Sequence, residues 1–114
     1  MSGFPKRVRL RRSQEFRTVY ERGARFSSPL FAAFCFRETQ AAVARIGFTV
    51  PRKLGPAVVR NRLKRRFREA VRFGLDRLNP QCSIVINPRL KALHAPFPEL
   101  QREVERLFLH CSGL

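Results

Sequence analysis

Cationic side chains recur along the segment VVRNRLKRRFREAVRFGL, residues 58–75. If this segment is a helix, one broad stripe of its surface carries an amide and four cations but no acid: Asn61, Lys64, Arg65, Arg68 and Arg72. Like charges three or four residues apart destabilise a helix unless a ligand neutralises them, and guanidinium groups bind phosphate oxygens with paired hydrogen bonds. Arg52 and Lys53, just upstream, extend the basic surface. The spacing therefore predicts a surface that binds the phosphates of a nucleic acid.

Three further cations of this segment have alternative explanations. Arg62 and Arg66 lie on another part of the helical wheel beside Glu69, where solvation and intrahelical ion pairs account for them. Apolar and small residues fall in another arc of the wheel, which we expect to face the core: Val59, Leu63, Phe67, Ala70, Val71, Gly74 and Leu78. Arg60 lies in the first turn on this core side of the wheel. Its long side chain can curl outward, either to meet RNA or to cap the edge of the fold.

Aromatic side chains are the second group able to bind nucleic acid, since the chain has 11 Phe and one Tyr. Phe16 and Tyr20 lie on one side of an expected first helix, and Phe34 and Phe36 alternate on one face of an expected strand. Such rings can stack on unpaired bases, and packing in the core is the alternative for each of them. We assign four other phenylalanines to the core: Phe31, Phe48, Phe67 and Phe108.

The sequence shows no catalytic apparatus of its own. His94 and His110 lie in dissimilar settings, and the 8 acids are spread singly, so we expect no catalytic residue and no metal site on the protein. Cys35, Cys82 and Cys111 are far apart and form no C-x-x-C pair. We expect all three to be reduced packing residues.

The composition sets the class of protein that must position these groups. With 24 Lys and Arg against 8 Asp and Glu, the 114 residues carry a net charge of +16, which requires a polyanionic partner. A GC-rich genome is an alternative explanation for the excess of Arg over Lys, but not for this charge. The chain is 44% hydrophobic, so residues 1–114 are expected to form a single domain, which binds nucleic acid through a basic face. Residues 1–12 form an extended or poorly ordered basic arm.

The sequence pattern predicts an order of elements. A short helix spans about 14–22, with Ser13 as its N-cap and Gly23 at its end. Strands are expected at 30–37, 44–50 and 82–87, with a turn at 39–42 and a loop at 90–96. Gly55-Pro56 opens the long helix and Asn79-Pro80 closes it, and a terminal helix runs from Phe97 to Cys111. No apolar run approaches the ~20 residues of a membrane helix, so we expect a cytoplasmic protein.

The stretch IGFTVPRKLGPAVVRNRLKRRFREAVR, from Ile46 to Arg72, resembles the signature of the protein component of bacterial ribonuclease P. Its hallmark is the R-N-R triplet, followed by a K-R pair and a further arginine: Arg60, Asn61, Arg62, Lys64, Arg65 and Arg68. The early helix with its aromatic pair, the I-V-I strand and the closing L-F-L-H-C segment also fit. The resemblance therefore spans nearly the whole chain.

The resemblance implies an α+β fold, in which a mixed sheet of about four strands packs with three helices. The family's crossover between parallel strands is left-handed, as in the ribosomal protein S5 domain 2-like fold, although about 98% of such connections are right-handed. It also implies a protein that binds a large catalytic RNA and helps it to remove the 5′ leader of precursor tRNA. The RNA performs the hydrolysis with Mg²⁺ that it mainly holds itself, and no protein partner is required.

The resemblance also assigns residues to the two RNAs. Contacts to the catalytic RNA fall on Arg52, Lys53, Arg60, Asn61, Arg62, Lys64, Arg65, Arg68 and Arg72. The leader lies in a cleft between the first helix and the sheet, lined by Phe16, Tyr20, Phe34 and Arg89. Tyr20 stands where the family commonly has phenylalanine, and Asn87-Pro88-Arg89 is less basic than is usual there.

Two other classes of protein remain open at the level of the sequence. One is a general or ribosome-associated RNA-binding module without a role in cleavage. The other is a DNA-binding protein that places the basic helix in the major groove. Stimulated cleavage of precursor tRNA and competition by duplex DNA would distinguish these classes.

Overall fold

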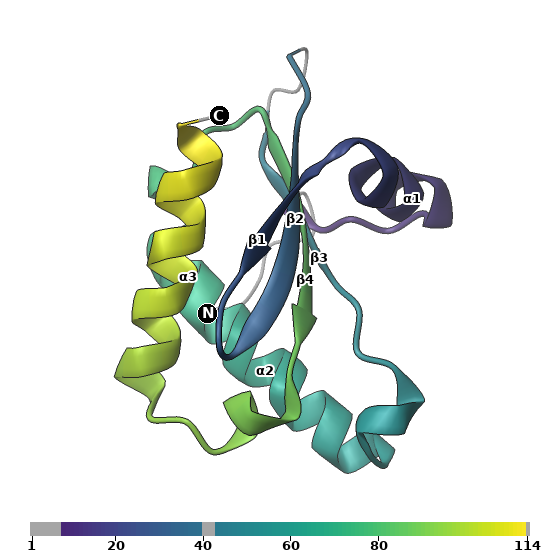
Figure 1. The fold of residues 1–114 in the computed structure, drawn as a ribbon, viewed down its shortest axis with the longest axis vertical. Helices are drawn as coiled ribbons and strands as arrows, with labels where there is room; N and C mark the ends of the chain where they lie inside the picture. The colour runs from purple at the N-terminus through teal and green to yellow at the C-terminus, as the bar shows by residue number, and fades with distance from the viewer. Residues whose placement is uncertain (1–7, 40–42, 114) are drawn as a thin grey trace.

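The computed structural model describes residues 8–39 and 43–113, which form four strands and three α-helices (Figure 1). The elements are α1 (Ser13–Arg22), β1 (Ala24–Ser27), β2 (Phe31–Arg37), β3 (Arg45–Phe48), α2 (Ala57–Gly74), β4 (Cys82–Pro88) and α3 (Phe97–Ser112). Three short 3-10 helices connect them: η2 (Arg52–Leu54), η3 (Leu75–Arg77) and η4 (Leu90–Leu93).

The four strands form one mixed sheet in the order β1-β2-β4-β3. The β1-β2 and β2-β4 pairs are antiparallel, and β3 lies parallel to β4 after a crossover through α2. The expected α+β class is confirmed. The left-handed sense of the crossover stays a prediction.

Several boundaries differ from the predictions. The edge strand β1 was not predicted, because only Phe26 of its four residues is buried and no alternation is visible. Ser13 is the first residue of α1 rather than its N-cap, which is Arg12. Pro56 is the N-cap of α2 rather than its first residue, and it follows a turn in which Gly55 adopts a φ of 144° that favours glycine.

The ends of other elements also differ. Helix α2 ends at Gly74 and continues as η3, so it stops before the expected Asn79-Pro80 signal. Strand β3 is shorter than the predicted range 44–50, and part of the expected loop at 90–96 is η4. Most of the expected turn at 39–42 lies outside the described residues.

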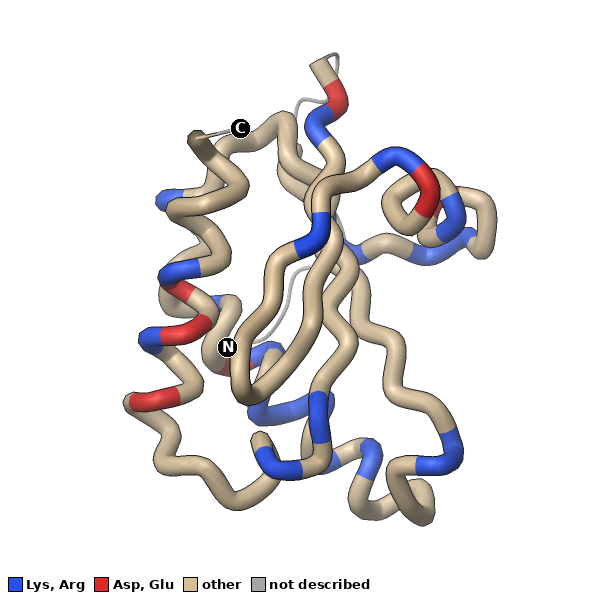
Figure 2. Tube along the Cα trace, viewed as in Figure 1, with Lys and Arg blue, Asp and Glu red and all other residues tan. Residues whose placement is uncertain are grey.

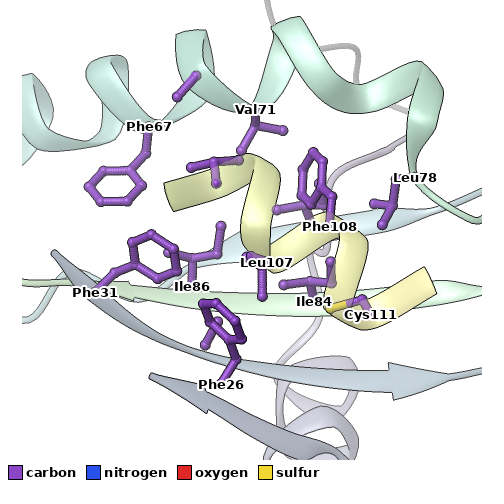
Figure 3. Close-up of a cluster of buried hydrophobic side chains, with 14 of the residues drawn as sticks. Phe26, Phe31, Phe67, Val71, Leu78, Ile84, Ile86, Leu107, Phe108 and Cys111 are labelled. Carbon is purple, nitrogen blue, oxygen red and sulfur yellow. The ribbon is translucent and has the colours of Figure 1, made fainter. Parts of the chain in front are cut away.

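The main core lies between the sheet and the pair of helices α2 and α3, and we call this side the α2/α3 face (Figure 3). Buried side chains from both layers meet there: Phe31, Ile84, Ile86, Leu63, Phe67, Val71, Leu107 and Phe108. The helical wheel placed Leu63, Phe67, Ala70, Val71 and Leu78 correctly in the core, whereas Val59 and Gly74 are only partly buried. Of the four phenylalanines assigned to the core, Phe48 is also only partly buried.

The opposite side of the sheet is covered by α1, and we call it the α1 face (Figure 1). Its cluster has three buried residues, Leu10, Val19 and Val85. Leu10 belongs to the basic arm, of which residues 8–12 are described: its N–H donates to the carbonyl of Ile46 (3.0 Å), and Arg9 forms a parallel bridge with Ile46. The arm is therefore joined to the edge strand β3 by a single bridge.

Two of the three cysteines are paired in the structure, contrary to the prediction. Cys35 of β2 and Cys111 of α3 form a disulfide with a Cα–Cα distance of 6.0 Å, so the expectation that all three are reduced was wrong. The two residues are 76 positions apart, and only the packing of α3 on the sheet brings them together. Cys82 is free and buried as expected, and burial raises the pKa of its thiol. Among the described residues, no helix is long and apolar enough to cross a membrane.

Candidate nucleic-acid interface

The outer surface of α2 carries the predicted cationic stripe. Asn61, Arg65 and Arg68 are exposed, and Lys64 and Arg72 are partly exposed. Figure 2 shows Lys and Arg along α2 and near its ends, whereas α3 carries acids and bases together. The amphipathic pattern explains this placement, because burial of Leu63 and Phe67 turns the intervening cations to solvent.

The single acid of α2 pairs differently from the prediction. Glu69 forms its ion pair with Arg72, a member of the stripe, at 2.5 Å, and not with Arg62 or Arg66. This hydrogen bond lowers the pKa of Glu69. Arg66 instead donates to the carbonyl of Ala95 and lies 5.9 Å from the centre of the Phe97 ring, so it ties α2 to the start of α3. The pattern within the helix could not predict this interaction of Arg66, because Ala95 lies outside α2.

The two ends of α2 extend the basic surface. Arg52 and Lys53 are exposed in η2, which packs against α2. Arg60 donates from Nε to the carbonyl of Gly55 (3.1 Å), so it closes the turn before the helix. Lys91, which the sequence did not single out, is exposed in η4, and η4 also packs against α2.

The charge of the basic arm acts on α2 at Arg68. Partial desolvation, followed by the positive charge of Arg9, lowers the pKa of Arg68, although a guanidinium stays charged at neutral pH. Arg9 was not predicted as a site residue, because no local pattern shows that residue 9 lies beside residue 68. The structure thus adds a cation from a separate segment to the stripe.

On the α1 face, the three aromatic residues predicted to line the leader cleft, Phe16, Tyr20 and Phe34, pack against one cluster. The Tyr20 and Phe34 rings lie edge to face, with their centroids 5.0 Å apart and their planes at 67°. The Tyr20 hydroxyl donates to Oδ1 of Asn87 (2.7 Å) and makes a second hydrogen bond with Oγ1 of Thr49 (2.9 Å). All three rings, including Phe16, are half-buried, so their faces are only partly available.

Phe16 and Arg89 occupy different surroundings. A Cβ atom at Gly47 would lie 2.4 Å from Cζ of Phe16, so Phe16 packs over a glycine of β3 that no larger residue can replace without movement. Arg89 is exposed where the chain leaves β4 for η4, and its N–H donates to the carbonyl of Leu30 (3.0 Å). Among the described contacts, none joins Arg89 to the three rings.

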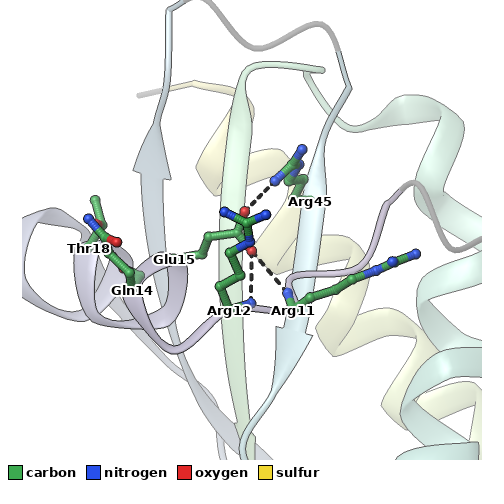
Figure 4. A network of polar contacts seen from close by, with 6 residues as sticks. All are labelled: Arg11, Arg12, Gln14, Glu15, Thr18 and Arg45. Atoms are coloured by element: carbon green, nitrogen blue, oxygen red, sulfur yellow. Dashed lines mark hydrogen bonds and ion pairs between the residues drawn. The ribbon is translucent and has the colours of Figure 1, made fainter.

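Polar contacts hold the start of α1 on the sheet (Figure 4). Oε1 of Glu15 accepts the backbone N–H groups of Arg11 (3.0 Å) and Arg12 (3.1 Å) at the start of the helix. Oε2 pairs with Arg45 of β3 at 2.5 Å. The hydrogen bond from Arg11, followed by that from Arg12 and the charge of Arg45, lowers the pKa of Glu15.

Comparison with known proteins decides the family. The family model described as Ribonuclease P matches residues 4–112. The chain belongs to the ribonuclease P protein family. One relative, the ribonuclease P protein component of Symbiobacterium thermophilum, is 42% identical over 103 residues, covering 90% of each protein. That of Bartonella quintana is 45% identical, covering 86% of this chain and 78% of the relative.

Solved structures of ribonuclease P proteins have the same fold. The protein from Thermotoga maritima superposes with a TM-score of 0.78 at 25% identity, covering 93% of this chain and 96% of that one. A mutant of the Staphylococcus aureus protein, described as defective in mRNA degradation activity, superposes with a TM-score of 0.81 at 24% identity, covering 95% and 90%. The four-stranded sheet with three helices is thus an arrangement found in the ribonuclease P proteins.

The acidic and sulfur-bearing groups of this family member form no metal centre of their own within residues 8–39 and 43–113. No three of the His, Cys, Asp and Glu side chains described there lie close enough to hold an ion. Glu15 and Glu69 form ion pairs with arginines, and the buried thiol of Cys82 donates to the carbonyl of Cys111. The two surfaces offer cations, amides and rings, which are groups that bind RNA.

Proposed function

We propose that this chain is the non-catalytic protein subunit of ribonuclease P, which binds the catalytic RNA and the 5′ leader of precursor tRNA and promotes maturation of the tRNA 5′ end. The match of the ribonuclease P family model to residues 4–112 carries this proposal. In this proposal the RNA cleaves the phosphodiester bond, with Mg²⁺ that it mainly holds itself. The chain acts as one RNA-binding domain in the cytoplasm and needs no further protein partner.

The catalytic RNA binds along α2 in this proposal. Phosphates would be neutralised by the exposed and partly exposed cations of the stripe and of the segments beside it: Arg52, Lys53, Arg60, Arg62, Lys64, Arg65, Arg68 and Arg72. Asn61 adds an amide that can donate and accept. Two of these cations are already engaged within the protein, Arg60 by Gly55 and Arg72 by Glu69, so the proposed binding depends on the other cations, among them Arg65 and Arg68.

The leader binds on the α1 face. A single-stranded leader exposes bases, and rings such as Tyr20 and Phe34 recognise bases with little demand on sequence, as an enzyme with many precursors requires. The half-buried state of Phe16, Tyr20 and Phe34 supports this role, because fully buried rings could not touch a base. Arg89, exposed beyond the end of β4, remains a proposed phosphate contact.

Reconstitution tests the function. The purified chain is mixed with the cognate catalytic RNA and a precursor tRNA at low Mg²⁺, and release of the 5′ leader is followed with and without protein. We expect the protein to accelerate cleavage. Binding of both RNAs without acceleration would favour the general RNA-binding module, and preferential competition by duplex DNA would favour the DNA-binding alternative.

Variants of α2 test the assignment of the stripe. Arg65→Ala with Arg68→Ala should weaken binding to the catalytic RNA and lower the slope of log affinity against log salt by about 0.7 to 0.9 for each phosphate that the variant no longer neutralises. The matched control is Arg102→Ala with Arg106→Ala, which removes two exposed cations from α3. An equal decrease of affinity in both double variants would show that net charge, not this surface, binds the RNA.

A further inference from the structure

Exposed cations lie at both ends of α1, Arg11 and Arg12 at its start and Arg22 and Arg25 at its end. At the start of α1, Arg45 is neutralised by Glu15 (Figure 4). At its end, Arg22 in the last turn and Arg25 in β1 are exposed, and neither takes part in the ion pairs between described residues. Glu21, the acid nearest in sequence, makes no such pair either. This end therefore keeps two cations available to a ligand.

Both guanidinium groups lie over aromatic rings of β2. Cζ of Arg22 is 5.1 Å from the centre of the Phe36 ring, and Cζ of Arg25 is 5.9 Å from that of Phe34. The sheet register explains the second contact, because Arg25 pairs with Phe34 across the two strands and both side chains point to the α1 face. Attraction between a cation and a ring holds each group in place before RNA binds.

The same contacts limit what a base can reach. Phe34 is flanked by the Tyr20 ring and by Arg25, and Phe16 is packed over Gly47. A nucleotide that approaches the β1-β2 side of this face therefore meets guanidinium groups before it meets Phe34 or Phe36. A guanidinium can stack its plane on a base and donate to a phosphate, which makes it suitable for binding single-stranded RNA.

We propose that Arg22 and Arg25 form a subsite for backbone phosphates of the precursor leader, next to Tyr20 and Phe34. This inference rests on the proposed function and adds where the leader's backbone lies on the α1 face: at the end of α1 beside β1, over the rings of Phe34 and Phe36. Only leaders long enough to reach this end of α1 gain affinity from it. The guanidinium groups are pre-positioned by the two rings, so less side-chain freedom is lost on binding.

The test uses the holoenzyme reconstituted from the full chain and its catalytic RNA. Its affinity is measured for precursors whose leaders are shortened one nucleotide at a time, and for mature tRNA. Arg22→Gln with Arg25→Gln is compared with the parent and with Arg102→Gln plus Arg106→Gln. The control removes two cations from α3, one of which also lies over a ring, since Cζ of Arg106 is 5.4 Å from the centre of Phe26.

We expect the Arg22 and Arg25 variant to bind long leaders about tenfold more weakly, and to bind the shortest leaders and mature tRNA as the parent does. Its salt slope for long leaders should fall by about 0.7 for each phosphate that is no longer neutralised. Arg22→Lys with Arg25→Lys should keep most of that slope while binding more weakly, because lysine retains the charge but not the planar fork. This second variant also guards against a folding defect in the first.

Two failures have different meanings. If the parent holoenzyme binds long-leader and short-leader precursors equally, the proposed recognition of the leader is wrong. If the parent distinguishes them and the Arg22 and Arg25 variant does so equally, with an unchanged salt slope, the leader binds elsewhere and this inference is overturned. An equally large decrease of affinity in the α3 control would also overturn it.

Discussion

The two faces of the sheet are built in opposite ways. On the α2/α3 face, long amphipathic helices close over a continuous set of fully buried side chains, such as Phe31, Phe67 and Leu107. On the α1 face, a helix of 10 residues covers three buried residues and leaves four rings half-buried. The first face provides most of the apolar burial that stabilises the domain. The second keeps rings and polar atoms within reach of a ligand, and its helix depends more on polar contacts.

The largest expected effect is a loss of stability from a substitution on the α2/α3 face. Phe67→Ala should lower the free energy of unfolding by about 3 to 5 kcal/mol. The Phe67 ring of α2 is fully buried against Phe31 of β2, and its removal leaves a cavity. Phe73→Ala is the control in the same helix, since that ring is 50% exposed, and it should cost far less. Denaturant unfolding measures both. Equal destabilisation would mean that the Phe67 ring is not part of the buried core of the α2/α3 face.

On the α1 face, the expected effect of substitutions is on RNA binding. Phe16→Ala with Tyr20→Ala should narrow the difference in holoenzyme affinity between precursor and mature tRNA, by about 1 to 3 kcal/mol for each ring that stacks on a base. Affinity for mature tRNA, the internal control, should hardly change. Unchanged discrimination between the two RNAs, together with a sharp fall in melting temperature, would identify both rings as core residues.

Tyr20→Phe separates the hydroxyl from the ring. The substitution removes the hydrogen bonds to Asn87 and Thr49 and leaves a half-buried amide oxygen without its donor, which should cost about 1 kcal/mol of stability. Stacking on the leader should persist. Thermal unfolding and leader-dependent affinity are measured together, and an unaltered melting temperature would show that the hydroxyl does not hold α1 on the sheet.

The smallest effect is a dependence on pH. Because the pKa of Glu15 is lowered in the folded protein, its charge stabilises the fold at pH values above the ordinary pKa of a carboxyl group. This contribution is lost as the pH falls through the pKa that Glu15 has in the folded state. Glu15→Gln should therefore cost less than about 1 kcal/mol at neutral pH, and the difference from the parent should vanish in acid. Glu21→Gln, exposed on the same helix, is the control. A difference that persists at low pH would contradict the role of the charge.

Periodicity accounts for the parts of the site that could be predicted. The positions of Leu63 and Phe67 in the core follow from helical spacing, and so does the exposure of Arg65 and Arg68. The aromatic pair on α1 could be read in the same way. Contacts between distant segments could not: Arg9 beside Arg68, and Arg66 on the carbonyl of Ala95. Nor did helical spacing show that Glu69 pairs with Arg72 rather than with Arg62 or Arg66.

The amino-acid sequence was sufficient for the family, the class of fold and the cationic surface of α2, because these depend on motifs, on composition and on local repeats of 3.6 and 2 residues. The packing of the elements decided which cations stay available and which rings stay open. Their availability depends on residues that are far apart in the chain and adjacent in the fold. Examples are the Cys35–Cys111 disulfide, the hydrogen bond from Tyr20 to β4 and the position of Arg25 over Phe34. A periodic pattern assigns a side chain to a face of its own element, whereas its partner is set by how the elements pack.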